Sequence, residues 1–278
     1  MCEITIGKPV NSTKYLTQID KNEADADFVN AVSENSEDVY VISHRETTVG
    51  LALLEGGIHA FLYVYIFPDY RRRGFGRTAV SLLEQELDRY HPVDIFTNYR
   101  TDDPIAAAFA RNCGYRKEYS SAYMVYSGPG FARESVPVRQ YQDQDYDETH
   151  SFYAKAFHLM RLSTGLFPDS VPNPASEKER KYWANTAEER LVYLDGDEII
   201  GYAHIEGSEI GSISVKPDRQ GQGVGKKFLK QLVNMLLDAG YTSISLYCVV
   251  GNDRAWHLYD KLGFTQEYCV DFAKKKRG

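Results

Sequence analysis

The stretch Arg71-Arg72-Arg73-Gly74-Phe75-Gly76 has a second copy later in the chain, Gln220-Gly221-Gln222-Gly223-Val224-Gly225. An amphipathic pattern follows each copy, which predicts a glycine loop that opens a helix. Gly74 and Gly223 lie 149 residues apart, and the glycines that close a later helix in each half, Gly114 and Gly263, keep that spacing. The sequence therefore predicts one fold used twice.

The organisation around the two loops predicts two α/β domains. Upstream of each loop, Thr48–Ala52 resembles Ile199–Ala203 at a spacing of 151 residues, so the halves differ by two residues in a loop. Each half reads as strand, one or two helices, hairpin, third strand, glycine loop, helix, strand, helix and last strand, which is typical of a mixed sheet. The turn-rich Ser127–Gly130 indicates a boundary near residue 132, with domains at 1–131 and 132–278.

Composition bounds the class of protein. The 278 residues carry 32 basic and 39 acidic side chains, a net charge of −7, which argues against a nucleic-acid binder. With no apolar run of about 18 residues and no signal-like start, we expect a cytoplasmic protein that does not bind membranes. The four cysteines lie far apart without a Cys-x-x-Cys pair, so we expect free thiols and no metal site.

Both glycine loops predict a site for a phosphate group. Glycines between a strand and a helix let backbone N–H groups approach an anion, and the helix N-terminus adds partial positive charge. Basic neighbours would reinforce this: Arg71, Arg72, Arg73 and Arg77 in the first copy, Arg219, Lys226 and Lys227 in the second. A Walker loop fails on spacing and lacks its hydroxyl residue, and a Rossmann loop would follow its strand directly.

Each loop resembles the Arg/Gln-x-x-Gly-x-Gly/Ala signature of the acyl-CoA N-acyltransferase superfamily, GNAT. The segment Asn252–Phe264 is similar to that family's Asn-x-x-Ala-x-x-x-Tyr-x-x-x-Gly-Phe stretch. The resemblance covers most of the chain and implies two tandem GNAT-like domains with a mixed α/β sheet. That arrangement is similar to the one in mycothiol synthase and some other bacterial N-acyltransferases.

The resemblance implies acetyl-CoA as co-substrate and assigns roles in the second half. Tyr259 would protonate the departing thiolate, and Glu209, fourteen residues before Gly223, would be the general base, with Glu206 as a nearby substitute. His204 and His257 are more typical of structural histidines. The cofactor contacts implied are Val215, Gln220, Gly221, Gln222, Gly223, Val224, Gly225, Lys226 and Asn252.

The first half keeps the loop but not the chemistry. When 149 is subtracted from each residue number, the position equivalent to Tyr259 is Ala110, the one equivalent to Asn252 is Asp103 and the one equivalent to Glu209 is Ala60. We therefore expect a catalytically degenerate N-terminal domain, although Arg71, Gly74, Gly76 and Arg77 are candidates for a second CoA contact. Tyr99 or Tyr115 as a proton donor would leave a second active site open.

These features favour an N-acetyltransferase that acts by direct transfer from acetyl-CoA to the primary amine of a small molecule. Two alternatives stay open: a non-catalytic module that binds acyl-CoA or a partner, and transfer to a protein amine. In this family the first two helices of a domain and their loop set acceptor choice, here about residues 145–188. This stretch predicts an aromatic-lined cleft, and the sequence predicts no oligomeric state.

Overall fold

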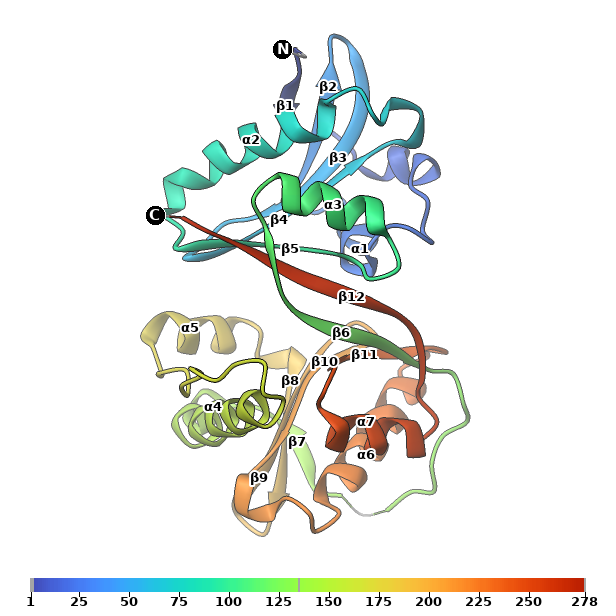
Figure 1. The fold of residues 1–278 in the computed structure, drawn as a ribbon. Helices are drawn as coiled ribbons and strands as arrows, with labels where there is room; N and C mark the ends of the chain where they lie inside the picture. The colour runs from blue at the N-terminus through green and yellow to red at the C-terminus, as the bar shows by residue number, and fades with distance from the viewer. Residues whose placement is uncertain (1–2, 135, 278) are drawn as a thin grey trace. The chain divides into compact units, whose positions relative to one another are not determined.

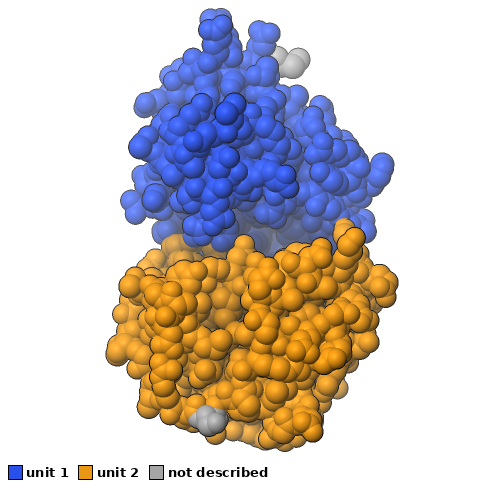
Figure 2. Space-filling view, turned by 180° about the vertical axis from the view of Figure 1, so that it is seen from behind, with its two compact units in different colours: residues 1–120, 269–278 blue, residues 121–268 orange. Residues whose placement is uncertain are grey.

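The computed structural model describes residues 3–134 and 136–277, which fall into two compact units. Unit 1 comprises residues 1–120 and 269–278, and unit 2 comprises residues 121–268 (Figure 2). Each unit is an α/β structure built on a mixed sheet, which confirms the predicted fold class. The units divide inside two strands, whereas the sequence indicated a boundary near residue 132.

Unit 1 follows the predicted order of elements. The sheet order is β1-β2-β3-β4-β5-β12, with the first residues of β6 beside β12. Its elements are β1 (Thr5–Gly7), η1 (Thr13–Gln18), α1 (Ala26–Ser33), β2 (Val39–His44), β3 (Thr47–Glu55), β4 (His59–Ile66), η2 (Pro68–Tyr70), α2 (Phe75–Leu87), η3 (Asp88–Tyr90), β5 (Asp94–Arg100), α3 (Pro104–Asn112) and the start of β6 (Arg116–Tyr126).

Unit 2 repeats that order with a longer first helix. Its sheet runs β6-β11-β10-β9-β8-β7. Its elements are β7 (Val138–Gln140), η4 (Asp143–Asp145), α4 (Tyr146–Ser163), α5 (Glu177–Asn185), η5 (Ala187–Glu189), β8 (Arg190–Asp195), β9 (Glu198–Glu206), β10 (Glu209–Val215), η6 (Pro217–Arg219), α6 (Val224–Asp238), β11 (Ile244–Val249), α7 (Asp253–Lys261) and the start of β12 (Thr265–Lys276).

Two strands each serve both halves of the sequence. β12 runs antiparallel to β5, from Val270 opposite Arg100 to Lys276 opposite Asp94, and so completes the sheet of unit 1. The end of β6 runs antiparallel to β11 and completes the sheet of unit 2. Each unit therefore contains a strand from the other half of the sequence, which is why no single residue divides the units.

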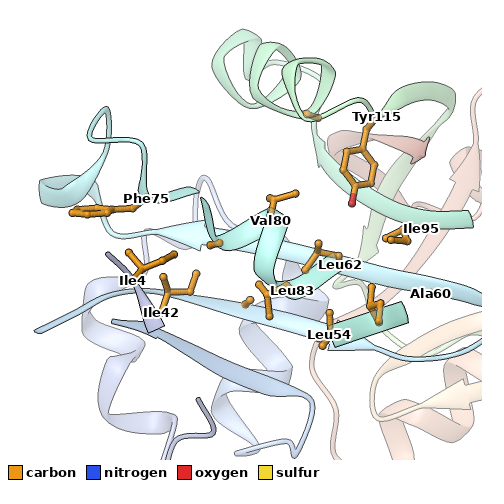
Figure 3. Close-up of a cluster of buried hydrophobic side chains, with 14 of the residues drawn as sticks. Ile4, Ile42, Leu54, Ala60, Leu62, Phe75, Val80, Leu83, Ile95 and Tyr115 are labelled. Carbon is orange, nitrogen blue, oxygen red and sulfur yellow. The ribbon is translucent and has the colours of Figure 1, made fainter. Parts of the chain in front are cut away.

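The core of unit 1 explains why the segment after the first glycine loop is a helix. Val80, Leu83 and Leu87 recur at helical spacing on α2 and are buried against the sheet. Figure 3 shows Val80 and Leu83 of α2 close to Leu62 of β4 and among the side chains of the neighbouring strands. Burial of one such leucine contributes about 2 kcal/mol.

Unit 2 has a helical layer on each face of its sheet. α4 and α5 lie on one side of β8 to β10, and α6 and α7 lie on the other (Figure 1). On the α4 side the ring of Tyr202 stacks on Trp183 of α5, with centroids 4.7 Å apart and planes 3° apart. On the α6 side Phe228 packs where Gly201 has no side chain. Neighbouring residues of β9 thus face opposite layers.

A buried carboxylate holds the C-terminal strand in unit 1. Glu84 on α2 is 5% exposed. Its carboxylate accepts hydrogen bonds from Lys275 Nζ at 2.7 and 2.9 Å, from the Tyr115 hydroxyl at 2.9 Å and from Arg277 at 3.4 Å. Lys275 lies near the end of β12, and Arg277 follows that strand directly. The cluster therefore attaches the last strand to α2.

We predict that Glu84→Ala lowers the free energy of unfolding by about 2–3 kcal/mol, because Lys275 loses its carboxylate partner in a mostly buried setting, whereas Arg277 keeps Asp88. Urea denaturation measures the change. Glu86→Ala is the matched control, since Glu86 lies on the same helix, is 54% exposed and reaches Arg89 only at 3.9 Å. An equal, small effect of both substitutions would contradict a structural role for the cluster.

Candidate active site

The two glycine loops have the same backbone conformation. Gly74 and Gly223, the N-caps of α2 and α6, both have φ of +84°. Two residues earlier, Gly221 has φ of +79° and Arg72 has φ of +64°, so both loops bend through the left-handed region twice. A left-handed arginine costs about 1 kcal/mol that glycine does not. The second copy is therefore the less strained of the two.

The same side-chain braces hold both loops. Gln220 Nε2 donates to the carbonyl of Val215 at 2.9 Å, and Arg71 Nε donates to the equivalent Ile66 carbonyl at 2.9 Å. A second pair repeats this likeness, because Gln222 bonds the Asp218 carbonyl at 2.9 Å and Arg73 bonds the Asp69 carbonyl at 2.8 Å. The polar residues of both signatures thus fix the end of the preceding strand and the short 3-10 turn that follows it.

A cavity of about 530 Å³ opens in unit 2 next to its glycine loop. β10 and β11 run parallel, and among the described residues their register pairs only Glu209 with Ser245. Beyond that pair the strands part, and the cavity lies along their parted ends. Its lining residues are Ala156, Phe157, Leu159, Met160, Ser163, Ile210–Val215, Gln220, Gly221, Gly225, Tyr247–Val249, Asn252, Arg254, Ala255, Leu258 and Tyr259.

The structure brings several predicted residues together at this cavity. Val215, Gln220, Gly221, Gly225, Asn252 and Tyr259 all line it. Gln222, Gly223, Val224 and Lys226 belong to the adjoining loop and the first turn of α6. The Asn252 side chain also caps α7, because Oδ1 accepts from the Ala255 N–H at 3.4 Å. Asn252 therefore has a structural role at the position expected for a ligand contact.

Tyr259 projects from α7 into the wall of the cavity. The residue is 7% exposed, and burial, with a smaller contribution from Cys248, raises its pKa well above the ordinary value. Its hydroxyl therefore stays protonated across the physiological range. Burial likewise raises the pKa of the Cys248 thiol to about 11, so this cavity-lining cysteine is a neutral thiol at pH 7 rather than a nucleophile.

Glu209 lies at the far end of β10 from Val215 and is not among the residues that line the cavity. Gly211, which does line it, forms a β-bulge opposite His204 and Ile205. A Cβ added to Gly211 would lie 3.9 Å from Glu209 Oε1 and 3.5 Å from His204 Nδ1. The missing side chain therefore leaves both groups close to the cavity wall. His204 Nε2 in turn lies 3.0 Å from Glu189 Oε2.

The cations near the second loop divide into two groups. Arg219 pairs with Glu198 and Asp195, and Lys227 lies 4.0 Å from Glu134. Lys226 has no ion pair among the described residues. Arg254 donates to Gln220 Oε1 at 2.8 Å and lines the cavity. Lys226 and Arg254 are thus the cations best placed for a phosphate group.

Among the described residues of unit 1, the space at the equivalent place is much smaller. A space of about 70 Å³ lies between β4, β5 and α3. Tyr63 stands where unit 2 has Ser212, and Tyr99 stands where it has Cys248, so rings occupy the volume that small side chains leave open. Phe109 lies 3.2 Å from the position of a Cβ on Gly76. The rings therefore fill most of the first cleft.

Two arginines of the first loop, Arg71 and Arg73, contact other residues of the chain. Arg71 pairs with Glu23 at 2.7 Å in addition to its bond with Ile66. Its guanidinium lies over the Tyr65 ring, and that of Arg73 lies over the Tyr70 ring. Arg77 is exposed on the first turn of α2. These contacts give Arg71 and Arg73 a structural explanation that needs no ligand, and they leave Arg72 and Arg77 exposed.

The Acetyltransferase (GNAT) family model matches residues 11–115 and 141–264, more than half of the chain. The chain belongs to this family of acetyl-CoA-dependent acetyltransferases, and the two matched regions confirm the tandem arrangement. Over 229 residues it is 25% identical to the mycothiol acetyltransferase of Clavibacter sepedonicus, which covers 78% of this chain and 72% of that protein. The chain is accordingly an N-acetyltransferase.

Solved structures support the fold over the whole length. A GCN5-related N-acetyltransferase from Sphaerobacter thermophilus has a TM-score of 0.73 at 18% identity and covers 98% of this chain and 95% of its own. A tandem GNAT protein from the clavulanic acid biosynthesis pathway has a TM-score of 0.62 at 15% identity and covers 99% of both chains.

Among the described residues, no helix is long and apolar enough to cross a bilayer.

Sequence reasoning missed three residues at the cavity. Arg254 lies inside the Asn252–Phe264 motif, and its positive charge two residues after Asn252 was the available signal. Ser212 and Ser214 alternate on β10, but a serine on a strand carries no signal of function by itself. Only the parting of β10 from β11 gives the two serines their place in the cavity wall.

We predict that calorimetric titration with acetyl-CoA finds one site per chain and that Gly223→Trp removes it. A tryptophan beside Gly221 and Gly225 would obstruct the loop where backbone N–H groups meet the phosphates. Gly74→Trp is the matched control, because Gly74 has the same φ in the first loop. Circular dichroism confirms folding of both variants. Loss of binding in Gly74→Trp with retention in Gly223→Trp would contradict this assignment.

Proposed function

We propose that the chain transfers the acetyl group of acetyl-CoA directly to the primary amine of a small molecule, in a ternary complex at the cavity of unit 2. The observation that carries the proposal is that one cavity is lined by the glycine loop, by Asn252 and by the buried Tyr259. Phosphate-binding and proton-donating groups thus share one space. The named relative supports acetyl transfer as the reaction.

In this proposal the glycine loop and α6 bind the pyrophosphate, with Lys226 and Arg254 supplying positive charge. The pantetheine arm lies between the parted strands, where β10 and β11 leave their facing backbone groups to a ligand. The backbone N–H near Val215 polarises the thioester carbonyl. These interactions place the reacting carbon beside the cavity wall formed by α4.

The amine nitrogen attacks the carbonyl carbon, a C–N bond forms, and the C–S bond breaks. The nitrogen loses a proton, which we assign to Glu209 through a water molecule beside Gly211. The departing sulfur receives a proton from the Tyr259 hydroxyl. Because Cys248 is a neutral thiol, no acetyl-cysteine intermediate is part of the scheme.

We assign catalysis to the domain at residues 132–278 and a structural role to the domain at 1–131. The small volume of the first cleft and the ion pair of Arg71 with Glu23 support this division. Ala110 offers no proton where unit 2 has Tyr259, and Tyr115 donates its hydroxyl hydrogen to Glu84 at 2.9 Å. Contact of the first loop with a second CoA is therefore not part of the proposal.

We predict that Tyr259→Phe lowers kcat about a hundredfold with little change in acetyl-CoA affinity, because the thiolate loses its proton donor. CoA release measured with a thiol reagent follows the reaction. Burial raises the pKa of Tyr259, so the wild type should keep its rate at pH values where an ordinary tyrosine, with a pKa of about 10, ionises. Tyr99→Phe, in the filled first cleft, should leave the rate unchanged. Equal rates for Tyr259→Phe and the wild type would remove Tyr259 from the mechanism.

We predict that Glu209→Gln lowers kcat/KM for the amine about a hundredfold at pH 7, because the water beside Gly211 loses its proton acceptor. The deficit should shrink as pH rises and the free amine becomes abundant. Glu206→Gln is the matched control, since Glu206 faces Glu209 across the hairpin as its register partner. The reverse order of effects would transfer the role to Glu206, and two unchanged rates would exclude both.

A further inference from the structure

The acceptor side of the cavity has an apolar wall. α4 contributes Ala156, Phe157, Leu159, Met160 and Ser163 to the lining. Leu159 is 43% exposed, so the wall reaches solvent at an apolar rim. About two consecutive turns of α4 thus present mainly apolar side chains to the cavity or its edge. A ligand group that lies along α4 would gain most from being apolar.

Charged groups are almost absent from this cavity. Among the described residues that line it, Arg254 is the one charged side chain, and it lies at the glycine loop with its guanidinium bonded to Gln220. No carboxylate lines the cavity in that part of the chain. A second ammonium group on the acceptor would therefore be taken out of water without a partner, which is costly.

One hydroxyl in the cavity wall is unpartnered. Ser214 is 6% exposed, and its Oγ has no hydrogen-bond partner among the described residues. Ser214 pairs with Tyr202 on β9 and so faces the same layer as α4, one residue before Val215. Ser212 on the same face is already engaged by a hydrogen bond with Tyr153. A buried hydroxyl without a partner is costly unless a ligand supplies one.

From these features we propose that the acceptor is a monoamine with an unbranched apolar or aromatic group. The amine nitrogen donates a hydrogen bond to Ser214 Oγ beside the thioester, and the apolar group lies along Leu159 and Met160. The inference rests on the proposed function and names the substrate class for that same site. It excludes polyamines and amino sugars as the preferred acceptors, because the α4 wall offers them neither carboxylates nor hydroxyl partners beyond Ser163.

The test compares hexylamine with 1,5-diaminopentane, two amines of similar length and basicity that differ in a terminal methyl or ammonium group. We expect kcat/KM for hexylamine to exceed that for the diamine by about tenfold or more. It should also exceed that for butylamine by about fourfold for each added methylene. Acetyl-CoA is held at saturation, and CoA release is measured with the whole chain.

Two substitutions on α4 test whether its apolar side chains cause the preference for hexylamine over the diamine. Met160→Asp places a carboxylate in the lining and should reduce the hexylamine-to-diamine ratio at least tenfold. Leu162→Asp is the matched control, because Leu162 lies on the same helix, is 41% exposed and is not among the lining residues. It should leave the ratio unchanged. Ser214→Ala should raise KM for hexylamine several-fold without changing the affinity for acetyl-CoA.

Three results would overturn the inference. A diamine rate equal to or above the hexylamine rate in the wild type would leave the proposed function intact and refute the apolar acceptor. A preference for hexanoyl-CoA over acetyl-CoA with butylamine, without any gain from hexylamine, would assign the wall to the acyl chain instead. No CoA release with these or with aromatic amines, despite acetyl-CoA binding, would refute the inference, and only the same result with amino sugars and polyamines as well would refute the proposed function.

Discussion

The separation of β10 from β11 is the constraint on which the rest of the site depends. Two parallel strands that pair at Glu209 and Ser245 and then part leave backbone edges and a space of about 530 Å³ between them. The bulge at Gly211 shifts the register of β10 against β9 at the same place. Through this separation the end of β10 meets the glycine loop on one side and α4 on the other. Without it, Tyr259 would be one more core tyrosine.

The first unit shows that a glycine loop beside two parting strands is not sufficient to form an open cavity. Its loop has left-handed backbone conformations at the same two positions. Arg71 and Arg73 make the same side-chain hydrogen bonds to preceding carbonyl groups as Gln220 and Gln222 make in unit 2. Its β4 and β5 pair in parallel over three residues, from His59 with Asp94 to Phe61 with Phe96, and then part. Tyr63 and Tyr99 occupy the space beyond that point. The two halves thus differ in the side chains that occupy the space beyond the parting strands, as well as in the bulge at Gly211 that β4 does not share.

Local motifs at fixed spacing made much of this molecule predictable. The glycine loops, the α6 helix and the position of Tyr259 depend on residues close together in the sequence, and the structure has them as expected. The exchange of β6 and β12 was not predictable, because strand pairing joins residues up to about 180 positions apart and no local pattern names the partner. Glu209, assigned by its distance from Gly223, lies outside the lining, and Arg219 pairs with Glu198, because distance along the chain alone does not tell where a side chain points. The roles of the site residues stay predictions.

The proposed mechanism requires that a single cleft, in the second unit, hold acetyl-CoA and that no acetyl group be bound covalently to the protein. Native mass spectrometry of the full chain titrated with acetyl-CoA tests this claim directly. We predict a mass increase that saturates at one acetyl-CoA per chain, with no acetyl adduct left on the protein after the complex is dissociated. Two acetyl-CoA molecules per chain at saturation, or an acetyl group retained on Cys248, would contradict the account.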